Sequence, residues 1–469
     1  MTRYLLAALA LLLAAPAPAL AQPASPATAT PAPDPLLAEL IRESLARRPE
    51  LRQADALVVA ERERVPQAGA LQDPMLTLGL QNDGFSGLQI GKMETSFWQV
   101  MITQPLPWPG KLGLRTELAS SGVRLAQASV ARARLTAEAD VRRAYLDLLL
   151  VRDRLALQAK LEALWSKAEG LSRIRYESGE GAQSDILRAQ LERNRQRQRR
   201  WALEAEERTR VQAINRLRGH HGAEPFPTTA TVGSLGLPVL PAVEAALADA
   251  ERRSPELAQA RVQAERAASQ VALARRERFP DLAVTAAIMP RGGLDPMWSA
   301  GVSVTLPIFS GGKQARAVAE SEARAAASDG GAETVLQMLR LRVQERLVLL
   351  ASLVQSAGLY QEGLLTQSQA TVDSTMSQYR VGRVTFASVL EAVGGVIADE
   401  EGFLQAVVAA WREAIAADEV SLDAAGGASS GMSGGSVPGA GAAGGKAMAQ
   451  GGGAAPAGGD AGSTPSSGM

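Results

Sequence analysis

The chain changes its hydrophobic period within one stretch, Trp98-Gln99-Val100-Met101-Ile102-Thr103-Gln104-Pro105-Leu106-Pro107-Trp108-Pro109-Gly110-Lys111. Trp98, Val100 and Ile102 lie on one side of a period-two alternation, which is typical of a half-buried β-strand. After Lys111 the pattern becomes helical as far as about residue 173. The prolines and the glycine between the two patterns mark a junction. This stretch therefore predicts a strand that leads directly into a long helix.

The second half of the chain repeats the first half. The junction returns as Leu306-Pro307-Ile308-Phe309-Ser310-Gly311-Gly312-Lys313. Three further blocks recur in the same order: Pro49-Glu50-Leu51 as Pro255-Glu256-Leu257, Pro74-Met75-Leu76 as Pro280-Asp281-Leu282, and Tyr176 with Gly179 as Tyr379 with Gly382. We interpret the repeat as one unit of helix, strand pair, long helix, tip turn and helix, present as residues 36–224 and 242–423. The Pro-rich segment 225–241 links the two copies.

Each copy contains two candidate strands with an apolar face and a face of small polar residues. Such strands can cross an outer membrane, which requires about 9 to 11 residues and an apolar outer face. A small soluble antiparallel sheet has the same alternation, so the strands alone leave both interpretations open. Because no apolar run beyond the N-terminus approaches the roughly 20 residues of a membrane helix, a membrane location would have to use these strands. Four strands cannot close a barrel, so several chains would have to share one.

The helical segments predict a long bundle or tube rather than a compact globule. Leu157, Leu161, Leu164, Ala168 and Leu171 follow the spacing of a coiled-coil seam. A helix from Lys111 to about residue 173 would be roughly 90 Å long. In the second copy the corresponding helix contains Ser328-Asp329-Gly330-Gly331, where we expect a kink or a break.

The two ends of the chain differ in composition from the repeat. Residues 1–21 have the basic start, the short apolar run and the small residues of a secretory signal peptide, with cleavage expected after Ala21. Residues 22–35 are expected to be a flexible segment. Residues 424–469 consist almost entirely of Gly, Ala, Ser and Pro and are expected to be a disordered tail.

Composition excludes several functions. The chain has no cysteine and balances 49 basic against 49 acidic residues, so it offers neither thiolate chemistry nor a general attraction to nucleic acid. The histidines, His220 and His221, are adjacent at a helix end and lack the spacing of metal ligands. The arginine-rich run 193–200 has acidic neighbours and fits a solvated helix face. No catalytic constellation and no cofactor motif is present, so we expect neither an enzyme nor a metal site.

Two features occur in both copies: the strand-to-helix junction, and the tip, which reads Tyr176-Glu177-Ser178-Gly179 and Tyr379-Arg380-Val381-Gly382. Both features resemble those of the TolC-like outer membrane efflux proteins, and the resemblance covers roughly residues 36–423. The resemblance implies a mainly α fold with a membrane β part. It implies a homotrimer in the cell outer membrane, in which each chain gives four strands to a twelve-stranded β-barrel and its helices to a periplasmic α-helical tunnel. It also implies two partners, a periplasmic adaptor and an inner-membrane pump.

The resemblance carries over functional roles to seven residues. Asp185 and Glu391 follow the two tips and match inward carboxylates of the gate, although Ser388 stands where some relatives carry another acid. A simpler explanation is that each acid interacts favourably with a nearby helix start. The tip residues Tyr176, Gly179, Tyr379, Gly382 and Arg383 match the contact surface for the adaptor, while turn geometry alone would also explain the glycines.

The resemblance leaves the substrate open. The Pro107-Trp108-Pro109-Gly110-Lys111 junction is similar to that of the heavy-metal-cation branch, and a drug or general small-molecule export channel is the alternative. A soluble periplasmic coiled-coil scaffold is a rival from a different class, but it would not require strands with an apolar face.

Overall fold

The protein is described by a computed structural model over residues 34–220, 222, 224–309 and 311–423. The expected signal peptide 1–21, the tail 424–469 and all but the last two residues of segment 22–35 lie outside the described residues. The elements of the first half are α1 (Pro35–Arg47), α2 (Pro49–Gly69), β1 (Met75–Gln81), β2 (Phe97–Leu106), α3 (Lys111–Glu177) and α4 (Gln183–Leu217).

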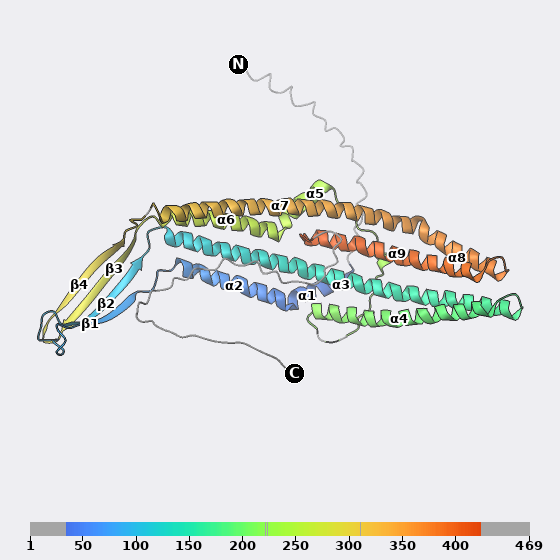
Figure 1. Ribbon diagram of the computed structural model, residues 1–469, viewed down its shortest axis with the longest axis horizontal. Helices are drawn as coiled ribbons and strands as arrows, with labels where there is room; N and C mark the ends of the chain where they lie inside the picture. The colour runs from blue at the N-terminus through green and yellow to red at the C-terminus, as the bar shows by residue number, and fades with distance from the viewer. Residues whose placement is uncertain (1–33, 221, 223, 310, 424–469) are drawn as a thin grey trace, which may run out of the picture. The chain divides into compact units, whose positions relative to one another are not determined.

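The second half contains the same succession of elements. After a short 3₁₀ helix, η1 (Val232–Leu235), it contains α5 (Val243–Arg253), α6 (Pro255–Arg276), β3 (Asp281–Arg291), β4 (Leu294–Thr305), α7 (Gln314–Leu359), the π-helical turn η2 (Tyr360–Leu364), α8 (Leu365–Arg380) and α9 (Phe386–Glu419). Helix α3 corresponds to α7, η2 and α8 taken together. The predicted order of helix, strand pair, long helix, turn and helix is therefore confirmed in both halves (Figure 1).

The four strands form one antiparallel sheet in the order β1-β2-β3-β4. The register places Leu78 opposite Val100, Val100 opposite Ile288, and Ile288 opposite Trp298. One face of the sheet is consequently apolar across all four strands, and these side chains are exposed in the single chain: Leu76, Leu78, Leu80, Trp98, Val100, Ile102, Val284, Ile288, Trp298, Val302 and Val304. The opposite face carries residues such as Thr77, Gln99 and Ser303. The predicted alternation is confirmed.

Of the kink or break expected at residues 328–331, helix α7 rules out the break. It is continuous from Gln314 to Leu359. Each glycine costs roughly 1 kcal/mol in a helix interior, and packing of α7 along α6 offsets that cost because Val318 and Leu339 are buried on either side of the glycines. The Thr334 hydroxyl also donates to the Gly330 carbonyl at 2.9 Å. The irregularity lies further on, in η2, where the Leu365 N–H donates to the Tyr360 carbonyl.

The buried side chains of the helices form two main clusters. One joins α3 with α1, α4 and α9 around Leu148, Leu149 and Ile214. The other lies at the tips and joins α3 and α4 to α8 and α9. The predicted seam of α3 is confirmed, since Leu157, Leu161 and Ala168 are buried. None of the helices in the described part of the chain combines the length and the apolar character that a membrane-crossing helix requires.

Candidate functional site

Both tip turns are built by the same backbone geometry. Gly179 follows α3 with φ +78°, and Gly382 follows α8 with φ +75°. The Glu180 N–H donates to the Arg175 carbonyl, and the Arg383 N–H donates to the Gln378 carbonyl, each at 2.9 Å. These are the bonds of a helix C-terminus closed by a left-handed residue, a conformation that glycine adopts without steric cost. Turn geometry therefore accounts for both glycines.

The two tip tyrosines have different surroundings although their local sequences match. Tyr176 is 47% exposed, whereas Tyr379 is 1% exposed. The Tyr379 ring packs edge-on against Phe386, with ring centroids 5.6 Å apart. The expectation that the Tyr379 side chain contacts an adaptor is therefore corrected, because burial leaves it no surface to present. Tyr176, Gly179, Gly382 and Arg383 are exposed.

Tyr379 joins the two tip hairpins through a group that we call the tip latch, made of Ser172, Arg175, Asp185 and Tyr379. The Tyr379 hydroxyl lies 3.1 Å from the Asp185 Oδ2 atom, to which it donates, and 3.1 Å from the Ser172 hydroxyl. The Arg175 guanidinium lies over the Tyr379 ring, 4.8 Å from its centroid, and donates to the Tyr379 carbonyl at 3.1 Å. The latch thus links the end of α8 to α3 and to the first turn of α4.

Burial is the main reason that the pKa of Tyr379 is raised above its usual value, and the Asp185 charge raises it further. The phenol therefore stays protonated and able to donate at neutral pH. The half-buried Asp185 accepts this bond as a carboxylate, and its position in the first turn of α4 is also favourable for a negative charge. Both the expected gate role and the simpler helix-start explanation fit this position.

Glu391 is not part of the latch. It lies on α9, its side chain is exposed, and it has no hydrogen bond or ion pair to any described residue. The single chain does not bring Glu391 together with Asp185, so a shared role stays a prediction. Sequence analysis missed Ser172 and Arg175, whose contacts to Tyr379 span more than 200 positions of the chain.

The described residues offer no evident site for a metal or a cofactor. They contain no group of three or more His, Asp or Glu side chains close enough to hold an ion. The His220 Nε2 atom instead lies 2.6 Å from the Arg47 guanidinium.

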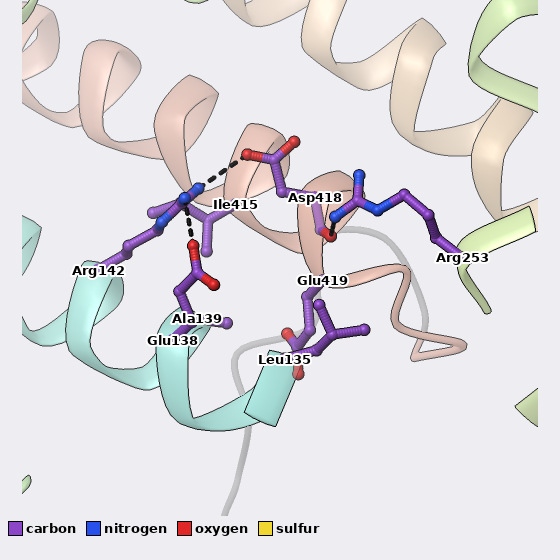
Figure 2. A pocket seen from close by; sticks show the side chains of 8 residues that line it. All are labelled: Leu135, Glu138, Ala139, Arg142, Arg253, Ile415, Asp418 and Glu419. Atoms are coloured by element: carbon purple, nitrogen blue, oxygen red, sulfur yellow. Dashed lines mark hydrogen bonds and ion pairs between the residues drawn. The ribbon is translucent and has the colours of Figure 1, made fainter. Parts of the chain in front are cut away.

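A hollow between α3 and α9 is lined by side chains that neutralise one another (Figure 2). Arg142 bonds both Glu138, at 2.5 Å, and Asp418, at 2.9 Å. Arg253 donates to the Asp418 carbonyl at 2.7 Å. Because its charges are already paired, the hollow is better explained as a structural joint than as a ligand site.

Beyond this hollow, arginines hold the chain that leaves α9. Arg346, which is 4% exposed, donates to the carbonyls of Ser421 and Asp423 at 2.5 and 2.8 Å. Arg132 donates to the Glu419 carbonyl at 2.9 Å, and Arg342 donates to the Leu422 carbonyl at 3.1 Å. The Arg132 bond satisfies the last carbonyl of α9, which has no intrahelical partner, and the other bonds fix residues 421–423 beyond the helix.

The chain is similar to a known protein family and to several solved structures. The family model described as outer membrane efflux protein matches residues 40–220 and 246–423. A comparison with curated protein sequences gives no match.

Several solved structures share the fold. A structure of CusC, described for its conformational changes on folding and transmembrane channel formation, superposes with a TM-score of 0.70 at 20% identity, covering 83% of this chain and 92% of that one. A membrane protein from Pseudomonas aeruginosa gives a TM-score of 0.71 at 18% identity, covering 82% and 92%. The outer membrane protein VceC from Vibrio cholerae gives 0.65 at 18% identity, covering 82% and 95%.

Proposed function

The chain belongs to the outer membrane efflux protein family, and from that premise we propose that it is the exit channel of a tripartite efflux system. Its location is the outer membrane, with its helices forming a tunnel in the periplasm. In the proposal three copies assemble, and the four strands of each copy contribute to one barrel whose outer face is the apolar face of the sheet. A periplasmic adaptor and an inner-membrane pump deliver the substrate, and the channel itself catalyses no reaction.

The tip latch is the observation that supports a gate. An open conduit would not need a buried tyrosine that bonds a carboxylate of the neighbouring hairpin at 3.1 Å. In the proposed closed state the latch holds the α8 and α9 hairpin against α3 and α4. Breaking it frees the hairpin to move away from the tunnel axis, and the exposed tip residues Tyr176, Gly179, Gly382 and Arg383 are available to an adaptor.

Glu391 has a different role in this proposal. It is exposed and unpaired among the described residues, so three copies would present three charged carboxylates near the constriction. A ring of carboxylates favours cations over anions. This preference supports cationic substrates, heavy-metal cations among them. The Pro107-Trp108-Pro109-Gly110-Lys111 junction supports the same choice, and a drug or general small-molecule channel is the alternative.

Two measurements test the proposal. Membrane fractionation followed by light scattering in mild detergent is expected to find a trimer in the outer membrane, and a soluble monomer or dimer would contradict it. In planar bilayers, Glu391→Gln is expected to lower the cation-to-anion permeability ratio. Asp329→Asn is the matched control, because it removes an exposed, unpaired carboxylate of α7 at a distance from the tips along the chain. Equal effects of the two substitutions would remove Glu391 from the gate.

The substrate is tested separately in the native host. Deleting the gene and measuring growth inhibition by heavy-metal salts and by organic drugs is expected to show sensitisation to the metals. Sensitisation to the drugs alone would favour the alternative substrate class.

A further inference from the structure

One turn distinguishes the second long helix from the first. At η2 the Leu365 N–H donates to the Tyr360 carbonyl, five residues back, which is the bond of a π helix. The counterpart of this helix in the first copy, α3, is one uninterrupted α-helix. Single π turns within α-helices often lie at functional sites and are a known cause of kinks. The turn therefore marks a place where the second long helix bends more readily than α3.

The turn takes up one extra residue of the second copy. Tyr176 follows Lys111 by 65 positions, whereas Tyr379 follows Lys313 by 66. Both helices run from the sheet junction to a tip, so the second copy fits one more residue into the same span. A turn with a bond to the fifth residue back accommodates it while α-helical bonds continue on both sides. The count does not say where along the helix this happens, and the structure places it at η2.

Glycines accompany η2 on both helices of the second hairpin. Gly358 precedes the turn and Gly363 lies within it, and α9 contains three more glycines. In the first hairpin, residues 155–161 of α3 and the whole of α4 contain no glycine. Each glycine weakens the preference of a helix for helical backbone angles. The second hairpin is therefore the one that deforms at lower cost.

The turn also lies between the two main buried clusters. None of the side chains of η2 reaches full burial. Before the turn, Ala357 belongs to the cluster around Leu148, and after it Val372 belongs to the cluster at the tips. On α9 the change between the same two clusters falls between Val396 and Phe403. A bend at this level thus leaves the first cluster intact and moves only the part of the tip cluster that α8 and α9 supply.

Tyr360 and Gly402 form a close contact between the two helices at this level. A Cβ atom on Gly402 would lie 2.6 Å from the Tyr360 hydroxyl oxygen and 3.0 Å from the ring carbon that carries it. Both distances are too short for non-bonded atoms, so the absence of a side chain at Gly402 allows the ring to lie against the backbone of α9. The helices are consequently held together beside η2, at the opposite end of α8 from the tip latch.

We propose that η2 is the hinge of the gate. When the tip latch opens, α8 and the adjoining part of α9 swing about the contact between Tyr360 and Gly402, while α3 and α4 stay straight. Hinges are formed by a few residues that absorb a change in backbone angles, and Gly358, Gly363 and the π turn absorb it here. The inference rests on the proposed function, because it specifies how a gate held by the latch moves.

Alanine substitution tests the hinge, because alanine keeps the backbone near helical angles. Its own helix backbone aside, a methyl group added at Gly358 would meet no described atom within 4 Å, and at Gly363 it would lie 3.6 Å from the Gln367 amide, an ordinary contact. Alanine favours the helix over glycine by about fivefold at each residue. The double variant Gly358→Ala with Gly363→Ala is therefore expected to lower the ratio of open to closed channels in planar bilayers by roughly tenfold, both in the native chain and with Tyr379→Phe.

Gly330→Ala with Gly331→Ala is the matched control, because these adjacent glycines also lie in α7 with room for a methyl group. The control is expected to leave the ratio unchanged. A conducting trimer in which both double variants act equally, or in which the first has no effect, would overturn the hinge and leave the channel proposal intact. A native chain that forms no conducting channel would overturn both.

Amide hydrogen exchange of the folded protein in mild detergent tests the hinge without a channel recording. The amides of residues 358–365 are expected to exchange at least about tenfold faster than those of residues 155–162, their counterparts in α3, because local opening is easier where a helix is weak. The double variant Gly358→Ala with Gly363→Ala is expected to slow this exchange. Equal protection of the two segments in the native chain would overturn the hinge.

Discussion

The substitution Tyr379→Phe tests the tip latch with the smallest change of shape. It removes the hydroxyl that bonds Asp185 and Ser172 but keeps the ring that packs against Phe386 and under the Arg175 guanidinium. The closed state should lose stability relative to the open state, while the folded helices should keep their packing.

The expected magnitude follows from the bonds that are lost. A hydrogen bond to a charged group contributes about 1.5–3 kcal/mol, and a half-buried Asp185 regains part of this from water, which leaves about 1 kcal/mol for each chain. If the three latches of the proposed trimer open together, the closed state loses about 3 kcal/mol. Since 1.4 kcal/mol corresponds to a factor of ten, the ratio of open to closed channels should rise by roughly 100-fold.

Single-channel recording in planar bilayers measures this ratio directly. Tyr176→Phe is the matched control, because that tyrosine occupies the same place at the other tip, is exposed, and bonds no described residue through its hydroxyl. We expect a large rise in open time for Tyr379→Phe and no change for Tyr176→Phe. An intact trimer in which Tyr379→Phe leaves the open time unchanged would refute the role of the latch.

Four further predictions concern the same residues and the helix ends. Asp185→Ala should raise the ratio of open to closed channels by a similar factor. In the same recordings, the double variant with Tyr379→Phe should be no more open than either single variant, because both substitutions remove the same hydrogen bond. Gly382→Ala should lower the unfolding temperature more than Gly179→Ala. Each substitution forces an alanine into a left-handed conformation, which costs about 1–2 kcal/mol, but only at Gly382 would the added methyl group lie 3.3 Å from Arg175. The pKa of Tyr379 is raised in the folded state, so the contribution of its protonated hydroxyl to folding stability should be complete below the ordinary tyrosine pKa of about 10 and should decline at higher pH. The difference in thermal stability between the native chain and Tyr379→Phe should therefore shrink above that pH. Arg346→Met should cost about 2–4 kcal/mol in denaturant unfolding because it leaves the buried Ser421 carbonyl without its donor, whereas Arg340→Met, at an exposed ion pair with Glu251, should cost less than about 1 kcal/mol.

Much of the fold was predictable because it depends on periodicity. The alternation of Leu76, Leu78 and Leu80 determines which face of β1 is apolar, and the spacing of Leu157, Leu161 and Ala168 determines which side of α3 is buried. Local preference wrongly allowed a helix break at Gly330 and Gly331, where helix packing outweighs a cost of about 1 kcal/mol for each glycine. The π-helical turn at Tyr360 had no recognisable sequence pattern.

The candidate site was predictable only in part. Asp185 was singled out from its position after the tip, but its bond to Tyr379 depends on how two distant hairpins pack. The motif shared by the two tips did not distinguish the exposed Tyr176 from the buried Tyr379. One difference between the tips was visible in the sequence: Ser388 occupies the place in the second copy that Asp185 occupies in the first.

The two copies of the repeat are alike at the sheet and unlike at the tips, and the physical demands at each end explain the difference. Both copies place a lysine after the second strand of their pair, Lys111 and Lys313, and the Lys111 ammonium bonds the Asp281 carboxylate where β2 pairs with β3. At the tips a latch needs two different halves. With Ser388 in the second copy, one hairpin supplies the acceptor and the other supplies the donor.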